Sequence, residues 1–265
     1  MTVLYTAKKN MKNNLRKFQL LVISGLILSG MDAAVASENG AGEVSGVTLG
    51  ASRVIYPSGA RSVNLGVSNS SDHPFLVKSE VLDESMQHEA PFIVTPPLFR
   101  LDGGQRNTLS ITRTGGDFPA DRESVNRVCV SSIPPEPDSA GDNSKKESGK
   151  DKISVTKRVL PVLCIKLFVR PESVRGNSLD VADKVTWTIK GNTVVASNPT
   201  PFYINISDAS VNGKKLKMGE SYKSYLPPFS EEQFPLPSGT VKNSTVKWKA
   251  VGDYGESKEE KTVLK

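Results

Sequence analysis

The sequence predicts an all-β protein built from two β-domains in tandem, and three observations lead to this fold class. From about residue 46 onward, apolar residues recur with period two over short segments, and Gly, Pro and Asn turn signals separate these segments. No stretch after the N-terminal region shows the 3.6-residue apolar period of a long amphipathic helix. Removal of a 36-residue leader leaves 229 of the 265 residues, which suits two domains of about 100 residues each.

Residues 1–36 are predicted to be a cleaved secretory signal peptide, with Met11 as an alternative start to Met1. A short apolar run over residues 18–30 precedes the small-x-small cleavage site Ala34-Val35-Ala36, and it is too short to span a bilayer. The run follows a basic region made of Lys8, Lys9, Lys12, Arg16 and Lys17. Without the leader the chain keeps 29 basic and 27 acidic residues, a net charge of +2. The pI of 9.2 for the whole chain therefore gives little reason to expect nucleic acid binding.

The first predicted domain covers residues 37–170. Its apolar side chains alternate with polar ones, as expected for strands with one buried face. The alternating apolar sets are Val63, Leu65 and Val67, then Phe75, Val77 and Val81, then Leu109 and Ile111, and finally Val128 and Val130 around Cys129. Seven such segments fit an antiparallel sandwich.

The second predicted domain covers residues 171–265 and is shorter. The boundary is placed at Arg170-Pro171, because proline cannot donate to a continuing strand ladder. Asn212-Gly213 predicts a hairpin turn, in which both residues need positive φ, and Gly191-Asn192 predicts another turn. The strand faces are Val185, Trp187 and Ile189, then Phe202, Ile204 and Ile206, then Val246, Trp248 and Ala250.

The two cysteines predict one disulfide, Cys129 to Cys164, because an exported chain meets an oxidising environment. The alternative is two free buried thiols. Residues 134–152, between the cysteines, are rich in Pro, Gly, Ser and charge, which predicts a mobile loop. Two cysteines and two scattered histidines are too few for a zinc site, so no metal or cofactor is expected.

After this loop, Ile153, Val155 and Val159 fall on one face of a predicted strand, and Lys157 interrupts the row. Pro161 fits an edge strand or a bulge and does not fit a central strand. An exposed apolar edge is an aggregation hazard unless a partner covers it. The alternation alone leaves two interpretations open, in which this face packs into its own core or is presented to a partner.

Lys166 lies inside the apolar segment Cys164–Pro171, and Arg53 begins another apolar segment near the start of the first domain. If the first and last strands of this domain are neighbours, the two cations converge and together suit a carboxylate. The alternative is two solvated strand residues.

Four segments carry a family resemblance that covers nearly the whole mature chain. They are SRVIYP at 52–57, PFIVTPPLFRL at 91–101, CIKLFVRP at 164–171 and NPTPFY at 198–203. In their order and spacing the chain resembles the periplasmic chaperones of the chaperone–usher pathway, which assemble fimbriae and capsule-like fibres. The long loop flanked by Cys129 and Cys164 resembles that of the long-loop subfamily.

The resemblance implies two immunoglobulin-like sandwich domains in a boomerang arrangement, and periplasmic localisation. It implies that Arg53 and Lys166 bind the C-terminal carboxylate of a fibre subunit. It also implies that Ile153, Val155 and Val159, together with Pro161, form a donor strand that completes the subunit's sandwich. Ile133, Pro134 and Pro135 are, by resemblance, contacts for an outer-membrane usher, and the free chaperone is expected to hide its donor strand by self-association.

The sequence leaves two other classes of function to consider, an enzyme and a fibre subunit. An enzyme is disfavoured because His73 and His88 lie in polar, turn-like stretches and the chain has no nucleophile elbow, phosphate loop or dinucleotide fingerprint. No small-molecule substrate is therefore expected. A secreted fibre subunit or adhesin of immunoglobulin-like fold is the remaining alternative. Residues 37–43 are short and polar, however, and do not resemble the donor segment that such a subunit carries.

Overall fold

A computed structural model describes residues 46–135, 160–218 and 224–265. The predicted signal peptide, and the predicted donor residues Ile153, Val155 and Val159, lie outside these ranges. Within them, no helix has the length and apolar character needed to cross a membrane.

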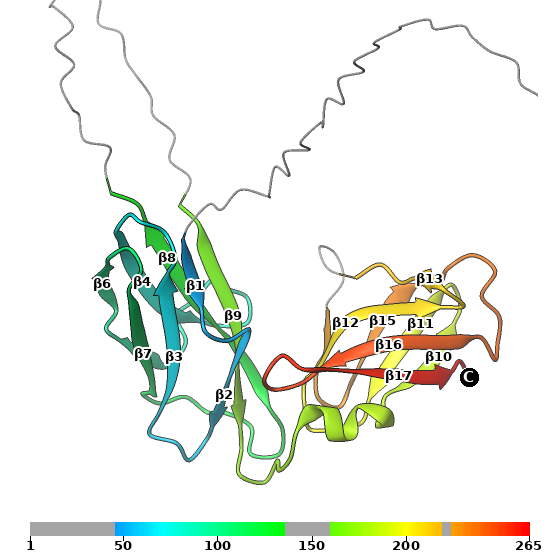
Figure 1. The fold of residues 1–265 in the computed structure, drawn as a ribbon. Coiled ribbons are helices and arrows are strands. Elements are labelled where there is room, and N and C mark those ends of the chain that lie inside the picture. Colours follow the sequence, from blue (N-terminus) through cyan, green and yellow to red (C-terminus); the bar gives the residue numbers. More distant parts are fainter. Residues whose placement is uncertain (1–45, 136–159, 219–223) are drawn as a thin grey trace, which may run out of the picture. The chain divides into compact units, whose positions relative to one another are not determined.

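The first domain is a β-sandwich of two sheets (Figure 1). One sheet has the strand order β1-β3-β7-β5 and the other has the order β2-β9-β8-β4-β6. The strands are β1 (Val47–Leu49), β2 (Arg53–Pro57), β3 (Ser62–Asn69), β4 (Phe75–Leu82), β5 (Phe92–Thr95), β6 (Leu98–Leu101), β7 (Arg106–Arg113), β8 (Ser124–Ile133) and β9 (Val162–Arg170). Each of the alternating sets noted in the sequence of this domain lies on one of these strands.

The pairing of β2 with β9 corrects the expectation of a wholly antiparallel sandwich. These two strands run parallel, and Arg53 lies opposite Lys166 in their register. The other strand pairs of the domain are antiparallel. The first and last strands of the domain are therefore neighbours, as the convergence of the two cations requires.

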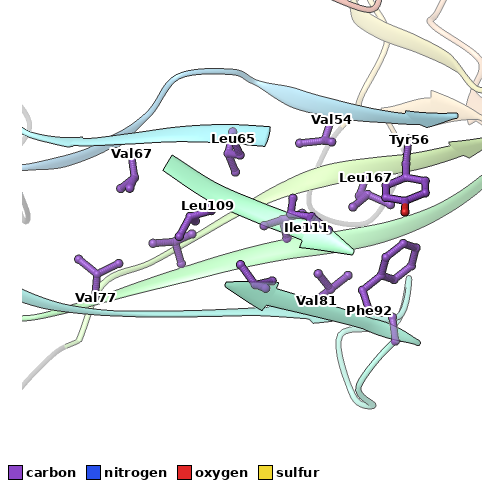
Figure 2. Close-up of a cluster of buried hydrophobic side chains, with 14 of the residues drawn as sticks. Val54, Tyr56, Leu65, Val67, Val77, Val81, Phe92, Leu109, Ile111 and Leu167 are labelled. Carbon is purple, nitrogen blue, oxygen red and sulfur yellow. The ribbon is translucent and has the colours of Figure 1, made fainter. Parts of the chain in front are cut away.

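The inner faces of the two sheets form the core of the first domain (Figure 2). Tyr56, Val77, Leu109 and Ile111 are fully buried there, and the Tyr56 ring meets Phe92 edge-on at a centroid separation of 5.4 Å. The Tyr56 hydroxyl lies near the backbone oxygens of the β2–β3 turn and accepts a hydrogen bond from the backbone N–H of Arg113. This phenol therefore fastens β7 to the turn while its ring fills the core.

The second domain has a three-stranded sheet of order β10-β11-β15 and a sheet of order β13-β12-β16-β17, to which β14 adds by pairing with β12 (Figure 1). The strands are β10 (Thr186–Lys190), β11 (Thr193–Asn198), β12 (Ile204–Val211), β13 (Lys214–Lys215), β14 (Tyr225–Leu226), β15 (Ser230–Pro235), β16 (Thr245–Val251) and β17 (Ser257–Val263). Trp187, Phe234 and Trp248 lie at the centre of its core. Asn212 and Gly213 have φ of 48° and 80° and join β12 to β13, as the sequence predicts.

The sequence did not predict the 3₁₀ helix η1 (Ser178–Lys184) that leads into the second domain. Asn177 caps this helix, and the Asp180 side chain reciprocates by accepting from the Asn177 backbone N–H. The segment is one short helix with the buried side chains Ser178 and Ala182. It is too short for its apolar period to be recognised.

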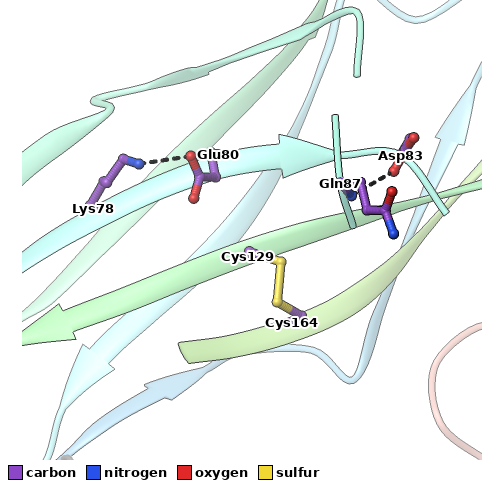
Figure 3. The surroundings of a disulfide bond; sticks show 6 residues. All are labelled: Lys78, Glu80, Asp83, Gln87, Cys129 and Cys164. Atoms are coloured by element: carbon purple, nitrogen blue, oxygen red, sulfur yellow. Dashed lines mark hydrogen bonds and ion pairs between the residues drawn. A yellow bond between two sulfur atoms is a disulfide. The ribbon is translucent and has the colours of Figure 1, made fainter. Parts of the chain in front are cut away.

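Cys129 and Cys164 form a disulfide across β8 and β9 (Figure 3), where they are directly opposite in register. Lys78 and Glu80 of the neighbouring strand β4 form an ion pair close by in the same view. The disulfide lies on the outer face of the sheet, because Val128 and Val130 on either side of Cys129 belong to the core.

Each domain has a buried asparagine whose side chain hydrogen-bonds to the backbone of nearby loops. The Asn69 amide lies within hydrogen-bond distance of the carbonyl oxygens of His73, Leu101 and Asp102, and its oxygen accepts from Ser71. The Asn198 amide approaches the carbonyl oxygens of Phe202, Leu226 and Pro227, and its oxygen accepts from Thr200. Each side chain satisfies the backbone of a loop that crosses the sandwich.

Replacement of Asn198 by alanine should destabilise the second domain by about 3 kcal/mol, since each buried polar group left unsatisfied costs roughly 1–3 kcal/mol. Both tryptophans of the chain lie in this domain, so urea unfolding followed by tryptophan fluorescence reports its stability selectively. Asn192→Ala, at an exposed turn position of the same domain, is the matched control and should leave the transition unchanged. Equal midpoints for the two variants would contradict the structural role of Asn198.

Candidate anion-binding site

Three cationic side chains lie in a row across three neighbouring strands. Arg53 on β2 is opposite Lys166 on β9, and Lys166 is opposite Arg127 on β8. Directly paired residues project from the same face of a sheet, so the three side chains share one face. We call Arg53, Lys166 and Arg127 the cation row.

Lys166 is the central member and is largely withdrawn from water. Its ammonium donates to Asn205 Oδ1 at 2.5 Å and lies 4.5 Å from the centroid of the Tyr225 ring. Burial, followed by the charges of Arg127 and Arg53, lowers the pKa of Lys166 to about 7. Among the described residues, the lysine has a neutral acceptor and an aromatic face as partners and no carboxylate.

Arg53 is half-buried beside it. Its Nη1 donates to the Val251 carbonyl oxygen at 3.3 Å, while its Nε is buried and has no hydrogen-bond partner in the described part of the chain. Burial lowers the pKa of Arg53, and the more distant charges of Asp253 and Glu256 oppose this shift. The guanidinium therefore keeps donors available for a ligand.

Arg127 was not identified from the sequence. Its Nε is also buried without a partner in the ranges that the structure covers, and its guanidinium lies 6.0 Å from the centroid of the Tyr225 ring. A sequence signal existed, because Arg127 precedes Cys129 by two residues and Lys166 follows Cys164 by two. In an antiparallel pair joined at those cysteines, these two side chains must lie opposite each other.

Apolar and aromatic residues adjoin the cation row. Ile55, Val125 and Phe168 on the same sheet face pack with Tyr203 and Tyr225 of the second domain. The Tyr225 hydroxyl donates to Glu84 Oε1 at 2.5 Å, which fixes the ring against which Lys166 and Arg127 lie. The low-polarity surroundings strengthen any interaction between these cations and an anion.

The cation row can bind an anion because its charges are uncompensated. Among the described residues, none of the three side chains forms an ion pair with a carboxylate. Three buried or half-buried cations of like sign repel one another, and a carboxylate placed among them removes that cost. Arginine offers a planar fork and lysine a compact charge, a combination that suits two carboxylate oxygens.

The remaining predicted site residues lie elsewhere. Pro161 comes directly before β9 and accepts a hydrogen bond from the Ser132 backbone N–H. Ile133, Pro134 and Pro135 line a surface pocket together with Leu76 and other residues from β4 and β6. That pocket is separate from the cation row, which lies at Arg127 on β8.

Family profiles match both domains. The profile "Pili and flagellar-assembly chaperone, PapD N-terminal domain" covers residues 46–175, and "Pili assembly chaperone PapD, C-terminal domain" covers residues 180–262. The chain belongs to the PapD family of pilus-assembly chaperones. This confirms the resemblance drawn from the sequence and the two-domain β fold.

Individual PapD-family relatives match over most of their length. Chaperone protein AfaB of Escherichia coli is 46% identical over 229 residues, which cover 83% of this chain and 91% of the relative. Chaperone protein caf1M of Yersinia pestis is 37% identical over 242 residues, which cover 89% of this chain and 92% of the relative.

Among solved structures, the E. coli chaperone DraB matches with a TM-score of 0.70 at 46% identity, over 83% of this chain and 97% of that one. The Salmonella enterica chaperone SafB, solved in complex with the SafA pilin, matches with a TM-score of 0.71 at 36% identity. The match covers 84% of this chain and 99% of SafB.

An ion triad connects the two domains of this PapD-family chaperone. Arg170 at the end of β9 donates to Glu123 Oε1 at 2.7 Å and to both Asp253 oxygens at 2.7 and 2.9 Å. Glu123 also accepts from the Tyr203 backbone N–H at 2.8 Å. The three charged side chains are nearly buried, with 12%, 2% and 10% of their areas exposed.

Replacement of Arg170 by alanine should destabilise the protein by about 3–5 kcal/mol, because it leaves two carboxylates buried without a counter-charge. Thermal unfolding at pH 7 measures the loss. The control is Arg122→Ala, which removes an exposed ion pair with Asp121 and should cost at most about 1 kcal/mol. A loss for Arg170→Ala as small as that of the control would argue against the triad as a structural support.

Proposed function

We propose that this protein is a periplasmic chaperone that captures fibre subunits by donor-strand complementation and passes them to an outer-membrane usher. The observation that carries the proposal is the cation row, which offers charge in a low-polarity setting and has no carboxylate of its own among the described residues. Family membership and the pilin complex of the relative SafB support the same function. A fibre subunit or adhesin, the alternative considered from the sequence, is not favoured by these matches.

In this proposal Arg53 and Lys166 bind the C-terminal carboxylate of the subunit. The ammonium of Lys166 exchanges its bond to the neutral Asn205 amide for an ion pair with the carboxylate, which is stronger because both partners are charged. The free Nε of Arg53 and its outer nitrogens supply parallel donors. The chain end of the subunit is thereby fixed in position.

The edge of β9 supports the proposed position of the bound strand. Among the described strands, β2 pairs with β9 from Lys166 to Arg170, and the Val162–Ile165 part of β9 pairs with β8 alone. Leu160, Val162 and Leu163 are exposed there, at 46%, 51% and 39% of their areas. A subunit strand added along this free edge would end where β2 begins, which is at the cation row.

The same proposal assigns roles to further segments of the chain. The donor residues would be Ile153, Val155 and Val159 with Pro161, upstream of the free edge. Residues 1–36 would be a signal peptide, and the domains would be 37–170 and 171–265. The usher would contact Ile133, Pro134 and Pro135, the free chaperone would self-associate, and the function would need neither catalysis nor a cofactor.

Arg53→Ala and Lys166→Ala should each abolish recovery of chaperone–subunit complexes from the periplasm. Loss of one charge-assisted bond costs about 1.5–3 kcal/mol, and a partly unpaired buried carboxylate adds to that loss. Co-purification of a co-expressed subunit with a tagged chaperone measures the effect. Arg106→Ala, at an exposed position of β7 away from the row, is the control.

Both variants should remain folded, because removal of one cation relieves repulsion within the row. Unaltered complex yield from either variant, with normal chaperone levels, would refute the proposal that Arg53 and Lys166 anchor the subunit by binding its C-terminal carboxylate.

Subunit binding should weaken as pH rises above about 7. Lys166 is protonated below its pKa of about 7 and loses charge above it, while a C-terminal carboxylate, with an ordinary pKa of about 3.5, stays ionised throughout. A bound carboxylate raises the lysine pKa, so one proton is taken up on binding at higher pH. The affinity should be level near pH 6 and fall by up to about tenfold per unit above pH 7.

Dissociation constants measured between pH 6 and 9 test this dependence. The Lys166→Arg variant keeps its charge over the whole range and should lack the fall, although its affinity at pH 6 is lower if the longer side chain fits poorly. A level profile for the unmodified protein would contradict a change in Lys166 protonation on binding within this pH range.

A further inference from the structure

We propose that Arg127 is a third ligand of the bound carboxylate, alongside Arg53 and Lys166. The inference rests on the proposed anchor function and extends it to a residue on a different strand. It makes the anchor a row of three donors that spans β2, β9 and β8.

The strand register places Arg127 at the site. Arg127 is the direct partner of Lys166 in the antiparallel β8–β9 ladder, as Arg53 is in the parallel β2–β9 ladder. Direct partners have Cβ atoms about 4.5–5.5 Å apart, which is within reach of a shared ligand for side chains as long as lysine and arginine. The Lys166 ammonium is therefore flanked by a guanidinium on each side.

The surroundings of Arg127 leave its donors free. Its buried Nε has no hydrogen-bond partner, and it forms no ion pair with any residue that the structure describes. Its guanidinium and the Lys166 ammonium both lie against the Tyr225 ring, at 6.0 and 4.5 Å from the centroid. A buried donor without a partner costs free energy in the empty protein, and a ligand oxygen would remove that cost.

The alternative role for Arg127 is indirect. Its charge is the largest contribution after burial to the lowered pKa of Lys166, and the charge of Arg53 follows. A residue that only tuned Lys166 in this way would change the pH dependence of binding without contacting the carboxylate. The two roles predict different results when the ligand's charge is removed.

The test compares two forms of one probe, a synthetic strand peptide of alternating valine and threonine that ends in a free carboxylate or in a C-terminal amide. Affinities of both forms are measured by fluorescence anisotropy at pH 6, where Lys166 is protonated. The proteins are the unmodified chaperone, Arg127→Gln, Arg127→Lys, Arg53→Ala and the control Arg106→Gln, which removes an exposed charge from β7.

We expect the unmodified protein to prefer the acid over the amide by more than tenfold, and Arg127→Gln to reduce that preference about tenfold. Arg127→Lys should keep part of the preference, and Arg106→Gln should keep all of it. Amide affinity should be the same for every protein, which shows that each variant still binds a strand.

Two results would overturn the inference. If Arg127→Gln keeps the full acid preference while Arg53→Ala loses it, the anchor stands but Arg127 is not part of it. If, in addition, NMR of ¹³C-methylated lysines shows that the Lys166 pKa rises in Arg127→Gln, the arginine acts only by tuning. Absence of any acid preference in the unmodified protein, including absence of binding, would refute the anchor and the inference together.

Discussion

The parallel pairing of β2 with β9 is the interaction on which the rest of the molecule's arrangement depends. It brings the first half of the first domain against its last strand and sets Arg53 opposite Lys166. Because β2 begins at that residue, the preceding part of β9 has β8 as its one partner among the described strands. One register thus fixes both the position of the cations and the end of the free edge. The remaining strands support that register by closing a core around Tyr56 and Leu167.

The cation row is an electrostatic cost that the fold tolerates. Burial and mutual repulsion disfavour three charges of like sign, and the effect is visible in the lowered pKa of Lys166. Among the described residues, the Tyr225 ring, Asn205 and the Val251 carbonyl offset it at close range, and the more distant charges of Asp253 and Glu256 favour the charged form of Arg53. Four residues after Lys166 on the same strand, the charge of Arg170 is instead neutralised by ion pairs with Glu123 and Asp253. The same sheet therefore holds one compensated cation that joins the domains and three uncompensated ones, which is the pattern of strain retained at a binding site.

Much of the fold followed from the sequence because period-two alternation and turn chemistry are local signals. The turn predicted at Asn212-Gly213 is present in the structure. The apolar residues predicted to share one strand face on β3, β4, β7 and β16 all lie in a core. The parallel pairing was missed because alternation gives the face of a strand and not the direction of its neighbour. Arg127 was missed for a related reason, since its partner lies 39 residues away and only the disulfide register relates them. The donor residues Ile153, Val155 and Val159 remain a prediction outside the described ranges.

The disulfide has a consequence for geometry as well as for stability. It joins Cys129 to Cys164 two register positions from the pair of Arg127 and Lys166, and therefore on the same face of the two strands. A slip of one residue between β8 and β9 would turn one of those cations to the opposite face, and the covalent bond forbids such a slip. The disulfide thus fixes the one β8–β9 register in which Arg127 and Lys166 lie opposite each other. Oxidation of this one cysteine pair therefore holds Arg127 and Lys166 on one face of the sheet.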